Sequence, residues 1–243
     1  MIFITYGQQK SASTFLANLA RQSCFAAGSD PDAVKKRLFT GELESQRKFW
    51  HGPLFPLGKL APQLVKGEHT VIKTHSRYRP AYAKALNRPR IKVLMSYRHP
   101  GDAALSAYEA GVRAREDNLP WPFFASLKSH REAIDAMALI LRRDTIPWLK
   151  SGLATAFDYD TLTRDSEVVV AQLAKALKTP PEQLMAYPGL AELMEGKTRV
   201  YNFNKGTAGR HRELFTAEDL AYLEEHCGPF IRFCNGDIGT DAL

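Results

Sequence analysis

Short apolar runs alternate along this chain with longer stretches in which apolar residues recur every three or four positions. Four of the runs are rich in β-branched and aromatic residues and predict strands: Ile2–Thr5, Thr70–Thr74, Ile91–Tyr97 and Leu153–Tyr159. Near-continuous apolar strands that alternate with helices are typical of a parallel sheet covered on both faces. The pattern therefore predicts an α/β fold with a central parallel sheet flanked by helices.

Helical periodicity follows several of these strands. The helix after the first strand would bury one face, made of Phe15, Leu16, Leu19, Ala20, Ser23 and Cys24. Further helices are predicted over residues 101–115 and 162–177, and a helical stretch over residues 121–149 with a break near Pro147. Residues 30–69 contain prolines and scattered aromatic residues, which predict irregular structure that faces a substrate.

The turn after the first strand is a candidate cradle for phosphate or sulfate, because ligands of such folds bind at the carboxyl ends of the strands. Gly7 lets the backbone approach a ligand, Lys10 adds a charge, and Ser11, Ser13 and Thr14 add hydroxyl groups. The start of the following helix contributes N–H groups and the positive end of its dipole. An N-cap by Ser11 or Ser13 beside a solvated lysine is the alternative interpretation. The turn is not a Walker A loop, which needs a glycine directly before the lysine.

Three further groups of basic and polar residues lie after later strands or near the C-terminus. They are Lys73, Thr74 and His75 after the second strand, Arg98, His99, Pro100, Asp102 and Ser106 after the third, and the cationic segment 204–212 with its two glycines. A solvated charge explains one such group alone. Four such groups, three of them at strand ends, indicate one anionic ligand that touches them all.

The composition is that of a folded protein, with 243 residues of which 44% are hydrophobic and 24% charged. This length predicts a single domain over residues 1–243, although two small domains would also fit. Lys and Arg number 33 against 26 Asp and Glu, which gives a net charge of +7. The excess favours an acidic ligand, nucleic acid or anionic membrane, unless it is spread over the surface and serves solubility.

The cysteines and histidines give no sign of a disulfide framework or a metal centre. Cys24, Cys227 and Cys234 have no CxxC spacing, which predicts reduced thiols and a cytoplasmic location. No metal site is expected, because spacings such as HExxH are missing around His51, His69, His99, His130 and His226. The N-terminus does not look like a signal peptide, and no apolar stretch approaches the roughly 18 residues of a membrane span, so no membrane insertion is expected.

In this order the motifs resemble those of the sulfotransferases that use 3'-phosphoadenosine 5'-phosphosulfate (PAPS). KSAST at residues 10–14 is similar to the family's 5'-phosphosulfate loop. YRHPGDAALSAY at 97–108 resembles its second signature, in which an arginine and a serine eight residues later, here Arg98 and Ser106, hold the 3'-phosphate. KTH at 73–75 matches the lysine and catalytic histidine of the cytosolic branch, FDYDTL at 157–162 looks like that branch's YED segment, and NKGTAGRHRELFT at 204–216 resembles the late glycine-rich loop.

The resemblance implies a sulfotransferase fold of the P-loop nucleoside triphosphate hydrolase-like kind and a set of residues that bind PAPS. These residues are Lys10, Ser11, Ala12, Ser13, Thr14, Phe15, Arg98, Ser106, Tyr159, Lys205, Gly206 and Arg210. Two positions depart from the family: Asn204 stands where an arginine is usual, and Phe15 where a tryptophan is often found. The entry Gly7-Gln8-Gln9 is more like the carbohydrate-modifying branch, so the acceptor partner is expected to be a small molecule or a carbohydrate.

Sulfuryl transfer would give distinct tasks to three of the candidate residues. Negative charge develops on the oxygen that leaves with the nucleotide and on the equatorial oxygens, so lysine and arginine can serve where kinases add a metal. We expect Lys10 to act on the leaving oxygen and Lys73 on the transferring group. His75 would be the general base that takes the proton of the acceptor hydroxyl or amine. Glu42 or Glu44 is the alternative base, since the carbohydrate-modifying branch employs a glutamate.

Two other functions fit part of the sequence. A nucleotide or small-molecule kinase is disfavoured, because the GK[ST] motif and a clear magnesium carboxylate are missing. A non-catalytic polyanion-binding protein would explain the net charge but not the basic residues after successive strands, so no nucleic acid is expected as a partner. An acceptor pocket or core packing would both account for Trp50, Phe55, Trp121, Phe123 and Phe124. The oligomeric state is left open.

Overall fold

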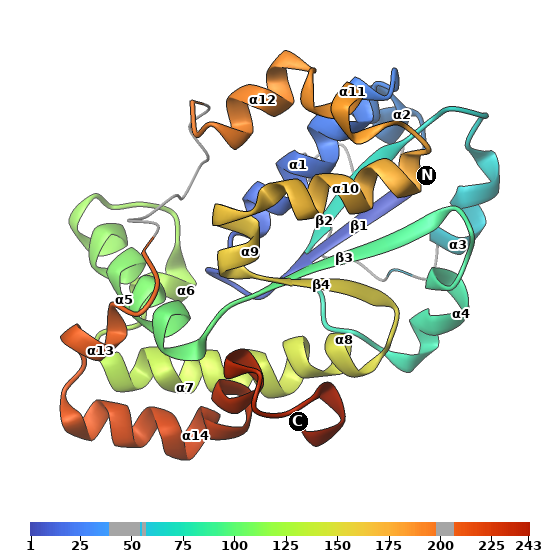
Figure 1. Ribbon diagram of the computed structural model, residues 1–243. Coiled ribbons are helices and arrows are strands. Elements are labelled where there is room, and N and C mark those ends of the chain that lie inside the picture. Colours follow the sequence, from blue (N-terminus) through green and yellow to red (C-terminus); the bar gives the residue numbers. More distant parts are fainter. Residues whose placement is uncertain (39–53, 55–56, 198–206) are drawn as a thin grey trace.

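The computed structural model describes residues 1–38, 54, 57–197 and 207–243 of the chain. Its centre is a sheet of four parallel strands: β1 (Ile2–Gly7), β2 (Thr70–Thr74), β3 (Ile91–Tyr97) and β4 (Ala154–Asp158). The strand order is β2-β1-β3-β4 (Figure 1), and Ile4 of β1 pairs with Ile72 on one side and Val93 on the other. The predicted α/β fold with a central parallel sheet is confirmed.

Helices cover both faces of the sheet, as near-continuous apolar strands require. Phe3 and Leu94 face a layer that contains α1 (Ser13–Ala26), α9 (Tyr159–Arg164), α10 (Ser166–Leu177), α11 (Pro181–Met185) and α12 (Pro188–Met194). Ile4 and Met95 face the opposite layer, with α5 (Pro100–Glu116), α7 (His130–Ile140), α8 (Ile146–Lys150) and α14 (Ala217–Asn235). The alternation of neighbouring residues between two cores follows from the two-residue period of a strand.

The remaining elements are short and connect these layers. They are α2 (Pro31–Leu38), α3 (Leu57–Leu60), α4 (Ala83–Leu86), α6 (Pro122–Ala125), α13 (His211–Leu214), a π-helical turn η3 (Leu141–Thr145), and the 3-10 turns η1 (Ala61–Gln63), η2 (Pro80–Tyr82) and η4 (Thr240–Ala242). The predicted buried face of α1 is confirmed for Leu16 through Cys24, while Phe15 is only partly buried and packs at the edge of that core.

Two predicted helices are each divided in the structure. The stretch 121–149 is predicted to break near Pro147, but α7, the π-helical turn η3 and α8 follow one another without a gap, so the chain stays helical past Pro147. The real break lies before α7, where Ser129 and Glu132 form a capping box and start a new helix. The stretch 162–177 likewise consists of α9 and α10. Asp158 caps the first of them by accepting from the Thr161 N–H, so Tyr159 begins a helix instead of ending β4.

Candidate functional site

The turn between β1 and α1 folds back tightly on itself. A Cβ atom on Gly7 would lie 2.0 Å from the Cβ of Ser13, so only glycine fits at this position. Lys10 and Ala12 have φ angles of 67° and 60°, in the left-handed region that residues with side chains seldom adopt. Strained turns of this kind are concentrated at binding and catalytic sites.

The N-terminus of α1 has no side-chain cap. Ala12 is the N-cap residue, and no side chain accepts a hydrogen bond there. The Ser11 hydroxyl instead donates to the Gln8 carbonyl at 2.6 Å and lies 2.8 Å from the Ser96 hydroxyl, which ties the turn to the end of β3. The N-cap interpretation of this turn is therefore wrong for Ser11 and Ser13. The first N–H groups of the helix are available to an anion in their place.

Lys10 lies beside other cations in a partly buried position. Its ammonium group is 5.2 Å from the centre of the Phe124 ring, a cation–π distance that places α6 next to the turn. Burial, followed by the charges of Arg113 and Arg98, lowers the pKa of Lys10 to about 8. A bound anion would reverse this shift, because it stabilises the charged form of the lysine.

Lys73 and His75 at the end of β2 both reach the same turn. The Lys73 ammonium donates to the Thr14 hydroxyl at 2.7 Å, and burial lowers the pKa of Lys73 to about 7. His75 Nδ1 lies 2.8 Å from the Gly7 carbonyl oxygen. A carbonyl only accepts, so Nδ1 carries the proton and Nε2 is the basic nitrogen of the neutral ring.

Arg98 connects the turn to the C-terminal part of the chain. Arg98 is 8% exposed, and its backbone N–H donates to the Gln8 side-chain oxygen at 2.9 Å. The guanidinium donates to the Lys10 carbonyl at 3.5 Å and to the Thr207 carbonyl at 3.0 Å. Its centre lies 3.8 Å from the centre of the Tyr159 ring, so the guanidinium stacks on the first residue of α9.

A buried pair of Asp102 and His211 fastens the segment after residue 206 to the start of α5. Asp102 accepts from His211 Nδ1 at 2.9 Å and from the Gly209 N–H at 2.8 Å, and both side chains are nearly inaccessible to solvent. The His99 ring stacks on His211 with centroids 4.5 Å apart. Gly101 leaves the room that His211 fills, since a Cβ there would lie 2.4 Å from the imidazole. We call Asp102, His211 and Gly209 the clasp.

The structure brings most of the predicted site residues into one cluster at the carboxyl ends of β1, β2 and β3. Ser106 is buried on α5, while Arg210 forms an ion pair with Glu109 of the same helix. Phe123 is 42% exposed. Several predicted positions lie outside the described residues: Glu42, Glu44, Trp50, His51, Phe55, Asn204, Lys205 and Gly206. The roles of all these residues stay predictions.

Sequence reasoning missed Arg113 as part of this cluster and gave Gln8 and Asp102, although they lie in the predicted groups, no role of their own. Gln8 is fully buried, and its Nε2 has no hydrogen-bond partner among the described residues; the same is true of Arg98 Nε and of Arg113 Nε and Nη2. The only sequence signal was the helical spacing of Asp102, Ser106, Glu109 and Arg113. Buried donors without partners favour an anionic ligand, because leaving them unsatisfied is costly.

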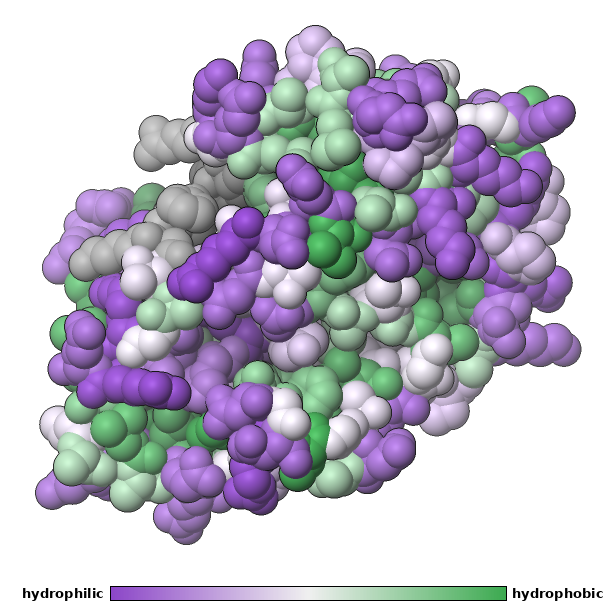
Figure 2. Space-filling model, viewed as in Figure 1, coloured by the Kyte–Doolittle hydropathy of each residue, from purple (hydrophilic) through white to green (hydrophobic). Residues whose placement is uncertain are grey.

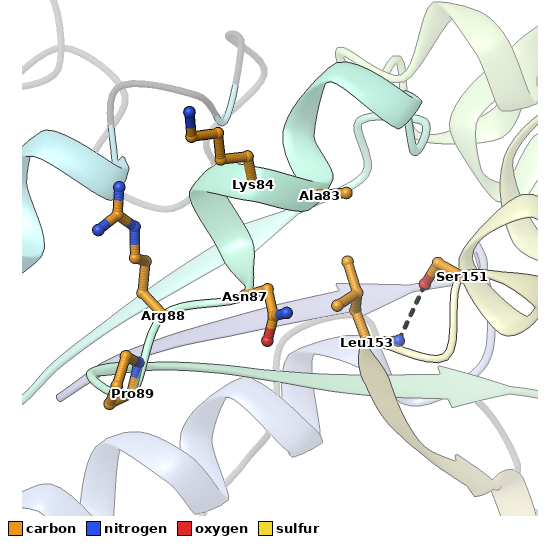
Figure 3. Close-up of a pocket in the computed structure, with 7 residues that line it drawn as sticks. All are labelled: Ala83, Lys84, Asn87, Arg88, Pro89, Ser151 and Leu153. Atoms are coloured by element: carbon orange, nitrogen blue, oxygen red, sulfur yellow. Dashed lines mark hydrogen bonds between the residues drawn. The ribbon is translucent and has the colours of Figure 1, made fainter.

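A separate hollow of about 540 Å³ lies away from this cluster. It is lined by Ala83, Lys84, Asn87, Arg88, Pro89, Ser151 and Leu153 (Figure 3). These residues precede β3 and β4, so the hollow is at the amino ends of the strands, where ligands of parallel sheets do not usually bind. It contains no predicted site residue.

The surface and the described side chains give two further findings. The face seen in Figure 2 is mostly hydrophilic, with apolar residues in smaller groups, and no described helix is long and apolar enough to cross a membrane. Within residues 1–38, 54, 57–197 and 207–243, no three His, Cys, Asp or Glu side chains gather where they could hold a metal ion.

The fold is that of the sulfotransferases. Mouse sulfotransferase SULT7A1 complexed with PAP superimposes with a TM-score of 0.54 at 14% identity, over 98% of this chain and 88% of that one. Retinol dehydratase in complex with androsterone and PAP gives a TM-score of 0.48 at 15% identity, over 93% of this chain and 79% of that one. A sulfotransferase from Alicyclobacillus acidocaldarius gives 0.37 at 17% identity, over 92% and 94%. No protein-family model and no curated protein matches the sequence itself.

Proposed function

We propose that this chain is a PAPS-dependent sulfotransferase, which moves a sulfuryl group from PAPS to an acceptor hydroxyl or amine. The observation that carries the proposal is the cluster of buried cations and unpartnered donors at the carboxyl ends of three parallel strands. Lys10 and Arg98 lie there beside an uncapped helix N-terminus. Such a site needs an anion with several charged groups to offset the cost of burying the cations.

The two ends of the cluster fit the two charged ends of the donor. The residues 10–14 and the first N–H groups of α1 would bind the 5'-phosphosulfate, as a helix N-terminus binds phosphate elsewhere. Arg98 and Ser106 would hold the 3'-phosphate, and the fully buried donor of Gln8 lies next to the Arg98 backbone. The PAP complex of the mouse protein with this fold supports the same nucleotide, since PAP (adenosine 3',5'-bisphosphate) is what PAPS becomes after transfer.

His75 is the residue best placed to take the acceptor proton. PAPS supplies, when bound, a sulfuryl group joined to a phosphate oxygen. A bond forms from the acceptor oxygen to sulfur while the bond from sulfur to the phosphate oxygen breaks, and the acceptor proton goes to His75 Nε2. The bond from Nδ1 to the Gly7 carbonyl holds the ring in the tautomer that this task requires. Lys10 and Lys73 stabilise the charge on the leaving and equatorial oxygens.

A small-molecule or carbohydrate acceptor and a cytoplasmic location complete the proposal. The partly buried Phe124, beneath the Lys10 ammonium, supplies an apolar surface near the reacting end of the site. Aromatic surfaces of this kind suit a phenol, a steroid or the face of a sugar ring. A screen of acceptor pools of these classes with radiolabelled PAPS would choose among them.

The donor site is tested by calorimetric titration with PAP, with 5'-AMP, and with random single-stranded DNA over a range of salt concentrations. We expect PAP to bind much more tightly than 5'-AMP, because the 3'-phosphate meets Arg98. We also expect binding to DNA to be weak and to vanish as salt rises, as for any basic surface. DNA binding tighter than PAP binding, or no preference for PAP over 5'-AMP, would overturn the proposal.

A further inference from the structure

One face of α5 carries four polar residues at helical spacing: Asp102, Ser106, Glu109 and Arg113. Steps of four, three and four residues place them in a single stripe along the helix. The stripe begins at the clasp, where Asp102 binds His211, and Ser106 is the residue predicted to hold the 3'-phosphate. The polar face of α5 therefore extends from the clasp, past Ser106 in the candidate nucleotide site, to Arg113.

Two buried donor atoms of Arg113 lack a partner among the described residues. Asp102 accepts hydrogen bonds from His211 and from the Gly209 N–H, and Glu109 pairs with Arg210. The Nε and Nη2 atoms of Arg113 are buried, and no described residue offers them a hydrogen bond or an ion pair. A guanidinium held in this way is costly in the absence of an anion, because its donors are removed from water without replacement.

The position of Arg113 on α5 allows its side chain to extend toward Ser106. Side chains on a helix lean toward its N-terminus, so a long residue covers the turn before its own Cα. Seven residues separate the two positions, a rise of about 10 Å, and a long arginine side chain can cover part of that distance. A phosphate can bridge the remaining gap, since it accepts hydrogen bonds on several oxygens at once.

The lowered pKa of Lys10 is a second indication that Arg113 belongs to this cluster. After burial, the charge of Arg113 is the largest influence that lowers the Lys10 pKa, ahead of that of Arg98. The Arg98 guanidinium in turn reaches the Lys10 carbonyl. Both arginines therefore lie near the same lysine, Arg98 just before α5 and Arg113 two turns beyond Ser106 on that helix.

We propose that Arg113 binds the 3'-phosphate of the donor nucleotide, opposite Arg98 and beside Ser106. The inference rests on the proposed function and adds to it a binding residue that no motif indicated. Arg113 would contribute two charge-assisted hydrogen bonds from Nε and Nη2, the paired geometry that suits guanidinium and phosphate.

Arg115 on the same helix is a matched control, because its guanidinium has a purely structural use. It donates to the carbonyls of Ala125 and Leu127 at 3.0 and 2.8 Å, which closes the turn after α6. Arg113→Gln and Arg115→Gln remove the same charge from α5 two residues apart. Thermal unfolding of both variants reports any general loss of structure.

The experiment is calorimetric titration of the wild type, R113Q and R115Q with PAP and with 5'-AMP, which lacks the 3'-phosphate. We expect R113Q to bind PAP about 10- to 100-fold more weakly while its affinity for 5'-AMP stays within about twofold. R115Q should bind both nucleotides as the wild type does. Unchanged PAP affinity in R113Q, or an equal loss for both nucleotides, would overturn this inference alone. A wild-type chain that does not bind PAP would instead overturn the proposed function, and this inference with it.

Discussion

Asp102→Asn should uncouple the C-terminal segment from the nucleotide site. The asparagine can still accept from the Gly209 N–H, now 2.8 Å from Asp102 Oδ2. Its amide group would then face His211 Nδ1, a second donor that now lies 2.9 Å from Oδ1. Two donors cannot share that contact, so the imidazole loses its partner in a site closed to water. The Thr207 carbonyl, which helps to hold the Arg98 guanidinium, should be displaced as a result.

The size of the effect follows from the pKa of Asp102. Burial alone would raise this pKa, but hydrogen bonds from His211 and from the Gly209 amide outweigh burial and lower it from 3.8 to about 2. A change of about two units corresponds to roughly 2 to 3 kcal/mol of stability at neutral pH. Because the folded-state pKa lies below the unfolded one, this contribution is complete above about pH 4 to 5 and is lost as the pH falls toward 2.

Asp219 supplies the matched control for this variant. Asp219 is also buried and lies 3.3 Å from a histidine ring nitrogen, His130 Nδ1, but it belongs to the capping box of α14. Urea unfolding at pH 7 should show that D102N and D219N are both less stable than the wild type, D102N by about 2 to 3 kcal/mol. Only D102N should also lose the preference for PAP over 5'-AMP. An equal preference in D102N and the wild type would refute the claim that the clasp positions Arg98.

Three further predictions concern the site itself. His75→Ala should keep its affinity for PAP but lose about two to four orders of magnitude in turnover. It should also lose the limb of the pH–rate profile near the histidine range. A variant that turns over like the wild type would rule out His75 as the base and leave Glu42 or Glu44 as the candidates. Lys10→Ala and Arg98→Ala should each bind PAP about 10- to 100-fold more weakly in calorimetry, and only Arg98→Ala should also lose the preference for PAP over 5'-AMP; wild-type affinity in both would refute the assignment. Burial lowers the pKa values of Lys10 and Lys73 to about 8 and about 7, and a bound anion must raise them again. PAP binding should therefore take up protons and weaken as the pH rises from about 7 to about 9. Calorimetry in buffers with different heats of ionisation measures this uptake, and binding without proton uptake would contradict the prediction.

The sheet was accessible to sequence reasoning because its signal is local. All four strands are apolar runs with polar residues at their carboxyl ends, and the order of strand and helix restricts such chains to a parallel sheet. Helix boundaries were harder, since the capping box at Ser129 and the cap at Asp158 depend on side-chain hydrogen bonds that apolar periodicity does not reveal. Pro147 predicts a break from its chemistry alone, but in the structure it follows a π-helical turn and the chain remains helical.

The candidate site could be predicted where its residues lie on one turn of the chain. It could not be predicted where residues far apart in the sequence make contact. Lys10, His75 and Arg98 follow strands and Lys73 lies near the carboxyl end of β2, and the sequence predicts them as site residues for that reason. The clasp joins residues more than a hundred positions apart, so neither Asp102 nor His211 has a local pattern that reports their pairing. Arg113 was missed because a charged residue on a helix is usually solvated, and only the burial of its nitrogens distinguishes it.

The central claim is that the chain transfers a sulfuryl group from PAPS, and its most direct test is the formation of PAP. PAPS would be incubated with the wild type and pooled phenol, steroid and sugar acceptors, and both PAP and sulfated acceptor quantified by chromatography. The account predicts PAP and sulfated product in equal amounts, at a rate that falls by about two to four orders of magnitude in His75→Ala. Tight binding of PAPS that yields no more PAP with any pool than without enzyme would contradict it.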